Sequence, residues 1–203
     1  MDYINFLEQR GFVLDRLIGR WVMPLDQVDW LQLKTIQAEA AAQDISINTL
    51  ATEMAQDPDA LHKLATLFEA AQQQMATRRT TPIQTVSVEK LAEDVANSSI
   101  QPSGSALFVA KRGEVYSAFL GLRNIEEDLG YGCVGIPLVD PEADFAPIAT
   151  ALHGRCLAWA RDHGLQSVYS FIDQRDDDIM AACQAIGYQR KLVMSILEMS
   201  LKD

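Results

Sequence analysis

Cysteine, histidine and long apolar runs are all scarce in this sequence. It has three cysteines and three histidines in 203 residues, and neither type shows the close spacing of a metal site. Neither a disulfide framework nor a zinc centre is therefore expected. No stretch approaches about 18 apolar residues, and the start lacks a basic region followed by an apolar core, so we expect no membrane span and no signal peptide. These absences favour a protein of the reducing cytoplasm.

Basic residues are also few. The chain has 17 lysines and arginines against 28 acidic residues, which gives a net charge of −11. This excess of negative charge disfavours nucleic acid and anionic membrane surfaces as partners. The hydrophobic content of 48% is typical of a chain with a packed core, and the length predicts one domain with an appendage or two small domains.

Helical patterns dominate before residue 77, and strand and helix patterns alternate after residue 105. A polar connection over residues 77–86 separates the two parts. Residues 2–10 predict a short helix, and residues 12–25 predict a strand or a short hairpin. Further helices are predicted over residues 26–40, 58–71, 87–95 and 179–186, and further strands over residues 106–110, 115–122, 167–172 and 191–201. This order predicts an α/β fold with a sheet of mixed direction.

The chain is organised around residues 132–164. The apolar run Cys133–Val139 predicts a buried strand, and a short loop with Pro141 and Pro147 follows it. Apolar residues at helical spacing then predict a helix that ends at Gly164. A strand, a tight loop and a helix start can together bind an anion, because free N–H groups and the helix dipole meet there. An ordinary strand-to-helix connection in an α/β domain is the alternative that stays open.

Several segments resemble the Gcn5-related N-acetyltransferase (GNAT) superfamily. Residues 106–122 resemble its second and third strands, and residues 139–164 are similar to its cofactor strand, loop and following helix. Residues 176–188 match the spacing of its Asn-x-x-Ala-x-x-x-Tyr-x-x-x-Gly-Phe segment. The resemblance covers about residues 47–203. It implies a GNAT-like fold with a mixed, mostly antiparallel central sheet flanked by helices.

The first part of the chain has three interpretations. Residues 6–12 and the strand-like stretch after them are similar to the last helix and strand of another GNAT domain, so the chain resembles the C-terminal half of a tandem member. This predicts an N-terminal extension over residues 1–46 and a GNAT-like domain over residues 47–203. Alternatively, the extension is an unrelated helix and strand that enlarge the sheet. In a third interpretation the chain forms a homodimer or tandem pair, and residues 1–25 complete a neighbour's sheet.

The resemblance implies an acyl-CoA-dependent N-acyltransferase that transfers an acetyl group to a small-molecule amine. The family's phosphate loop, Arg/Gln-x-x-Gly-x-Gly/Ala, corresponds here to Asp144, Pro147 and Ala149, and only Ala149 agrees. Asp144 puts a carboxylate where a cation is usual, and Pro147 removes one N–H donor. The residues expected to contact acetyl-CoA are Leu138, Val139, Phe145, Ala146, Ile148, Ala149 and Thr150.

Three further residues are candidates for the chemistry that the resemblance implies. Cys183 stands where the family has a tyrosine that protonates the departing thiolate, although packing in the core is the alternative. Tyr131 and Glu127 are expected at the amine substrate, although an ordinary solvated acidic loop would also explain Glu127. The departures at Asp144 and Pro147 leave a second hypothesis, in which the chain is a catalytically inactive GNAT-fold module that binds a ligand or a protein.

Overall fold

The structure of the protein is a computed structural model that describes residues 3–78, 89, 106–126 and 130–198. Its centre is an eight-stranded sheet in the order β2-β3-β4-β5-β7-β1-β8, with β6 paired to β4 outside this path. The strands are β1 (Val13–Pro24), β2 (Ile45–Thr49), β3 (Ala106–Arg112), β4 (Val115–Glu126), β5 (Tyr131–Val134), β6 (Leu138–Val139), β7 (Ser167–Asp173) and β8 (Gln189–Glu198). Only β5 and β7 pair in parallel among these strands, which confirms the predicted α/β fold with a mixed, mostly antiparallel sheet.

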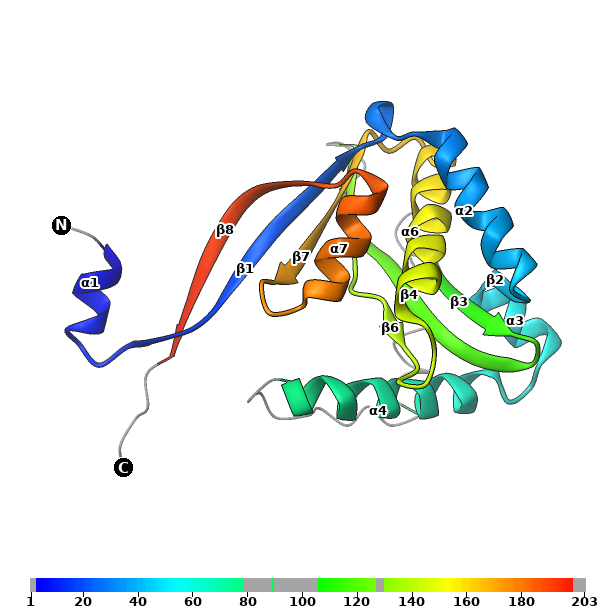
Figure 1. Ribbon diagram of the computed structural model, residues 1–203, viewed down its shortest axis with the longest axis horizontal. Helices are drawn as coiled ribbons and strands as arrows, with labels where there is room; N and C mark the ends of the chain where they lie inside the picture. The colour runs from blue at the N-terminus through cyan, green and yellow to red at the C-terminus, as the bar shows by residue number, and fades with distance from the viewer. Residues whose placement is uncertain (1–2, 79–88, 90–105, 127–129, 199–203) are drawn as a thin grey trace.

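Helices cover both faces of the sheet (Figure 1). The described helical segments are α1 (Tyr3–Glu8), the 3-10 turn η1 (Leu25–Gln27), α2 (Trp30–Ala42), α3 (Leu50–Gln56), α4 (Ala60–Arg78), α6 (Phe145–Asp162) and α7 (Asp177–Ile186). The main core lies between the sheet and α2, α6 and α7, where Leu152 and Leu157 are fully buried. A smaller cluster around Leu64 and Val109 joins α3 and α4 to the other face. None of the helices in the described ranges is both long and apolar enough to cross a membrane.

The N-terminal strand β1 lies inside the sheet. It pairs antiparallel with β7 on one side and with β8 on the other, and these two strands belong to the same chain. Residues 12–25 therefore form one strand rather than a hairpin, and the pairing differs from the hypothesis that residues 1–25 complete a neighbour's sheet. Trp21 and Met23 of β1 and Leu33 of α2 pack in the main core. The division of the chain at residue 46 stays a prediction.

The predicted strand over residues 133–139 is interrupted. β5 ends at Val134, and the chain re-enters the sheet as β6 after Gly135 and Pro137. Proline has no N–H for a strand ladder, so a central strand cannot run through it unbroken. The Gly135 N–H instead donates to the Gly121 carbonyl at 2.7 Å. The helix predicted after this strand is confirmed as α6, whereas the helix predicted over residues 87–95 falls outside the described residues except at residue 89.

This interruption opens the sheet between two neighbouring strands. β5 and β7 pair only from Tyr131–Ser167 to Cys133–Tyr169, and β6 then pairs with β4 alone. The carboxyl ends of the two parallel strands therefore separate. In open α/β sheets ligands bind at such a point, because side chains and free backbone groups are both accessible there.

A buried polar network attaches α3 to the sheet face opposite α6 and α7. The carboxylate of Glu53, which is 1% exposed, accepts hydrogen bonds from Lys111 at 2.8 Å, Asn48 at 2.6 Å and Tyr116 at 3.3 Å. Burial acts to raise the pKa of Glu53, but the hydrogen bonds from Lys111 and Asn48 outweigh it and leave the pKa below its usual range. The network therefore holds a charged carboxylate in the interior.

Removal of the lysine should destabilise the protein strongly. Lys111→Met leaves the Glu53 carboxylate buried without its counter-ion, and we expect a loss of about 3 kcal/mol in the free energy of unfolding. Urea denaturation measures this loss. Arg112→Met, at the exposed neighbouring position on β3, is the matched control and should change the stability by less than about 1 kcal/mol. Equal stability of the two variants would contradict a structural role for the ion pair.

Candidate ligand-binding opening

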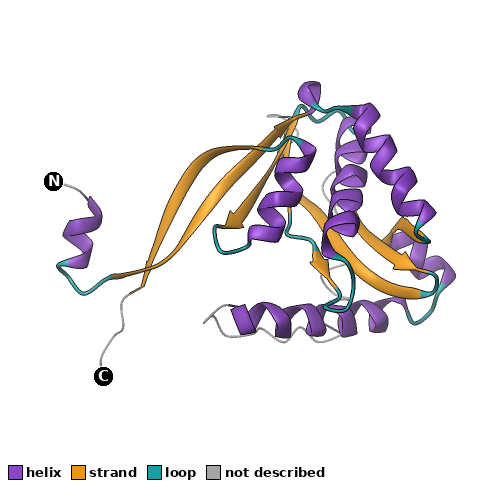
Figure 2. Cartoon of the chain, in the orientation of Figure 1, coloured by secondary structure: helices purple, strands orange, loops and turns teal. Residues whose placement is uncertain are grey.

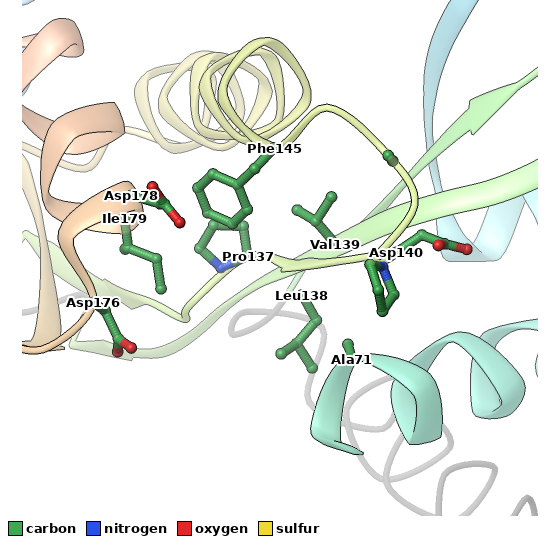
Figure 3. A pocket seen from close by; sticks show the side chains of 11 residues that line it. Ala71, Pro137, Leu138, Val139, Asp140, Phe145, Asp176, Asp178 and Ile179 are labelled. Atoms are coloured by element: carbon green, nitrogen blue, oxygen red, sulfur yellow. The ribbon is translucent and has the colours of Figure 1, made fainter. Parts of the chain in front are cut away.

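A pocket lies at the opening between the two parallel strands. Figure 3 shows it between β6, the starts of α6 and α7, and one turn of α4. The ring of Phe145 projects from the start of α6 toward Pro137, and Ala71 closes the side formed by α4. The lining residues are Ala71, Pro137, Leu138, Val139, Asp140, Pro141, Ala143, Phe145, Asp176, Asp178 and Ile179.

The start of α6 offers two backbone donors to this pocket. Asp144 is the N-cap, and its side chain makes no capping hydrogen bond. The first N–H groups of a helix have no partner within the helix, which leaves those of Phe145 and Ala146 for a ligand. Pro147 follows and has no N–H. The anion site predicted from the sequence therefore keeps two donors in its first turn and lacks the third.

The edge of β6 supplies a further donor and acceptor. The Asp140 N–H donates to the Ser117 carbonyl of β4 at 2.7 Å. Backbone groups alternate in direction along a strand, so the N–H and carbonyl of Val139 point away from β4, toward the separated β7. An extended ligand with an amide group can therefore pair with Val139 as a strand would.

The charged groups around the opening are acidic. Asp140 lies on one side of the pocket and Asp176 and Asp178 lie on the side of α7 (Figure 3). No lysine, arginine or histidine is among the described residues that line it. The nearest arginine in the sequence, Arg175, is paired with the Asp173 carboxylate through two hydrogen bonds of 3.0 and 2.7 Å. The charged side chains that line the opening are therefore carboxylates, which disfavour an anionic ligand.

The residues predicted to contact acetyl-CoA occupy different environments. Leu138, Val139 and Phe145 line the pocket, and Ala146 is exposed in the first turn of α6. Three others fall in the next turn of α6. Ile148 and Ala149 are fully buried in the core, and the Thr150 hydroxyl donates to the Ala146 carbonyl at 2.6 Å. The side chains of these three residues do not face the opening.

Cys183 lies in the core rather than at the pocket. Its side chain is fully buried on α7, with the sulfur 3.9 Å from Nε2 of His153. Burial raises the pKa of this thiol to about 12, so it stays protonated near neutral pH. The predicted role as proton donor would require the thiol to reach the opening, and the alternative of core packing describes its environment here.

Tyr131, one of the two predicted substrate residues, is not among the residues that line the pocket. Tyr131 begins β5 and is half-buried, and its ring meets that of Tyr169 edge-on with centroids 5.8 Å apart. Its side chain lies on the sheet face opposite α6, because its neighbour Gly132 is on the buried side. Glu127 falls outside the described residues. Neither position is tested by the pocket geometry, and both assignments stay predictions.

The sequence did not identify several polar residues that lie in the core or line the pocket. His153 and Tyr188 are buried side by side, with ring centroids 5.6 Å apart, and neither His153 Nδ1 nor the Tyr188 hydroxyl has a hydrogen-bond partner in the described part of the chain. The position of His153 next to Leu152, on the apolar side of its helix, was the sequence signal for its burial. Asp176 and Asp178 were not among the predicted site residues, although they line the pocket.

No protein-family model and no curated protein matches this sequence. Solved structures do match the fold. A GCN5-related N-acetyltransferase from Sphaerobacter thermophilus superposes with a TM-score of 0.65 at 16% identity, covering 96% of this chain. A tandem GNAT protein from the clavulanic acid biosynthesis pathway gives 0.66 at 14% identity over 97%. A GCN5-related N-acetyltransferase from Kribbella flavida gives 0.59 at 12% identity over 96%.

The chain therefore has the GNAT fold, as the sequence resemblance implied. It spans 54%, 57% and 62% of the lengths of these three structures. Because the identities are low, the likeness extends to the backbone architecture and leaves the chemistry of the opening to be argued from this chain's own residues.

The residues at the opening do not fit the diphosphate of acyl-CoA. A phosphate at a helix start is held by free N–H donors, and a nearby cation strengthens its binding. Here the loop carries Asp140, Glu142 and Asp144, while Pro147 removes a donor. The Glu142 N–H is already used, because it donates to the Asp140 carboxylate at 2.8 Å.

The buried histidine makes stability depend on pH. Burial lowers the pKa of His153 to about 4, whereas the unfolded chain has a value near 6.5. The unfolded state therefore binds the proton first as the pH falls, and stability decreases between about pH 6.5 and 4. Between pH 7 and pH 5 the lowered pKa of His153 should decrease the free energy of unfolding by about 2 kcal/mol.

Urea denaturation at both pH values tests this expectation with His153→Met. The variant should lose about 2 kcal/mol less than the parent protein between pH 7 and pH 5. His62→Met, on the exposed side of α4, is the control and should keep the parent's pH dependence. The same pH dependence in all three proteins would show that His153 does not remain neutral in the core.

Proposed function

We propose that this chain is a GNAT-fold binding domain that does not itself transfer acyl groups from CoA. One observation carries the proposal: at the opening of the sheet Asp140 lines the pocket, and no lysine, arginine or histidine is among the pocket's described lining residues. Asp144 adds a further negative charge at the start of α6. These carboxylates oppose the diphosphate of acyl-CoA, whose binding a cation at this place would favour.

The energies involved are large enough to decide between the hypotheses. Two like charges at ~4 Å repel by about 1 kcal/mol in water and by roughly 4 kcal/mol in a partly screened site. Loss of a charge-assisted hydrogen bond at Pro147 costs about 1.5–3 kcal/mol more. Together these effects would weaken CoA binding by several powers of ten. A protonated small-molecule amine, by contrast, is favoured by the same carboxylates and remains the ligand expected at the opening.

An acyl-CoA-dependent N-acyltransferase is the second candidate function. It is favoured by the backbone of the opening, where Val139 offers a free N–H and carbonyl and where Phe145 and Ala146 offer two further N–H groups. These groups suit a ligand that contains amides and an anionic group. The backbone therefore keeps part of the geometry that would bind acyl-CoA, whereas the acidic side chains oppose this binding.

Calorimetric titration with acetyl-CoA distinguishes the two functions. We expect no heat of binding at millimolar acetyl-CoA and no acetyl transfer to a panel of primary amines, because the acidic opening repels the diphosphate. The same amines, titrated without acetyl-CoA, should give binding heat. Saturable binding of acetyl-CoA together with turnover of any amine would overturn the proposal and establish the acyltransferase.

A designed gain of binding tests the physical reason. Asp144→Arg combined with Pro147→Gly supplies a cation and restores the missing N–H at the start of α6. We expect affinity for CoA to rise by at least about a hundredfold, measured by the same titration. Glu142→Arg is the control, because it makes the same charge change on an exposed residue of the same loop without altering the helix start. An equal gain in the control would show that only overall charge matters.

A further inference from the structure

An aromatic row lies on the sheet face opposite α6 and α7. In β7, Tyr169 and Phe171 meet edge-on with ring centroids 5.5 Å apart, and Tyr131 of β5 packs against Tyr169 in the same manner. The neighbouring residues Val168 and Ile172 are fully buried on the other face. Phe171 is 40% exposed, so the row presents ring surface against which a flat molecule can stack.

Two arginines flank this row from neighbouring strands. Strand register places Arg123 of β4 opposite Cys133 of β5, and Cys133 beside Tyr169 of β7. It also places Arg20 of β1 opposite Phe171. Residues paired in this way project from the same face of a sheet. The guanidinium of Arg20 indeed lies 4.8 Å from the centroid of the Tyr169 ring.

The ion pairs among the described residues include neither of these two arginines. Arg16, Arg161 and Arg175 each form an ion pair. Arg20 and Arg123 form none within the described residues, and Nε of Arg20 is buried without a hydrogen-bond partner there. An unsatisfied buried donor is costly, and an anion bound at this surface would satisfy it.

The pKa of the Cys133 thiol depends on the charges of both arginines. Burial raises the pKa of Cys133, and the positive charges of Arg123 and Arg20 oppose this rise. Both guanidinium groups are therefore close enough to stabilise an anion at the position of this sulfur. In a chain with a net charge of −11, this is a local region of opposite sign.

We propose that this surface, formed by Arg20, Arg123, Cys133, Tyr131, Tyr169 and Phe171, binds a planar organic anion such as an aromatic carboxylate. Guanidinium groups donate paired hydrogen bonds to a carboxylate, and the rings stack on the flat body of the ligand. We call this surface the aromatic–arginine face. A nucleic acid is disfavoured, because a polyanion is repelled by the negative charge of the whole chain. The proposal goes beyond the function of the opening and does not depend on whether acyl-CoA binds there.

Cys133 provides a built-in reporter for this proposal. Cys156 and Cys183 are fully buried, whereas Cys133 is partly exposed. The native protein is treated with iodoacetate, an anion, and with iodoacetamide, its neutral analogue, and modification is assigned to Cys133 by peptide mass spectrometry. The ratio of the two rates is insensitive to the pKa of the thiol, because the same thiolate attacks the iodomethylene carbon of both reagents and displaces iodide.

We expect the rate ratio to fall by about tenfold in the Arg20→Gln, Arg123→Gln double variant, since two guanidinium charges near the sulfur no longer attract the anionic reagent. Arg155→Gln, an exposed arginine on α6, is the control and should leave the ratio unchanged. If the double variant fails to fold by circular dichroism, Arg123→Gln alone, at an exposed position, should still lower the ratio by about threefold. An unchanged ratio in a folded variant would overturn the proposal.

Protection by a ligand tests recognition itself. Benzoate should slow iodoacetamide modification of Cys133 in a saturable way, at least fivefold more than benzamide at the same millimolar concentration (roughly what one charged contact adds). The difference should vanish in the arginine variants and persist in Arg155→Gln. Equal protection by benzoate and benzamide would refute the aromatic–arginine face as an anion site. Neither outcome alters the acetyl-CoA titration at the opening, so the two proposals fail separately.

Discussion

The candidate site depends on the point at which β5 stops pairing with β7. The two strands are parallel from Tyr131 to Cys133, and Pro137 then prevents the chain from continuing in the same ladder. β6 turns toward β4, and the sheet divides. The separated edges, the start of α6 and the start of α7 converge on this division, so the pocket follows from one broken strand pairing rather than from its side chains.

Architecture and side-chain chemistry impose separate demands on this sequence. The fold needs apolar residues such as Leu152 and Ile172 in the core and a glycine with a left-handed backbone at the end of α7, where Gly187 has φ 103°. The chemistry of the opening needs a particular charge at residues 140–147. Because the first set is intact, the backbone superposes on GNAT structures even though the second set departs from the family's pattern.

The sequence predicted the helices and strands better than it predicted which strands pair with one another. Apolar spacing located α6 and α7 and the hairpin of β3 and β4, because these signals are local. It could not place β1 between β7 and β8, since strand order depends on contacts between residues far apart in the chain. At the site, position in a motif assigned Cys183 to chemistry, but burial is set by the packing of α7 against α6. The acidic start of α7 at Asp176 can be identified in the sequence. Its closeness to β6 depends on tertiary packing and cannot.

The placement of β1 has a consequence for how the molecule acquires its shape. Val13 pairs with Glu198, so the ribbon of β1 and β8 closes a loop that contains almost the whole chain (Figure 2). During synthesis β1 leaves the ribosome before β7 and β8, and its hydrogen bonds are complete only when both of these strands have formed. Such high contact order slows folding, and meanwhile the edge of β7 can attract a strand from another molecule. Overproduction at reduced temperature is therefore the condition under which this chain should fold most completely.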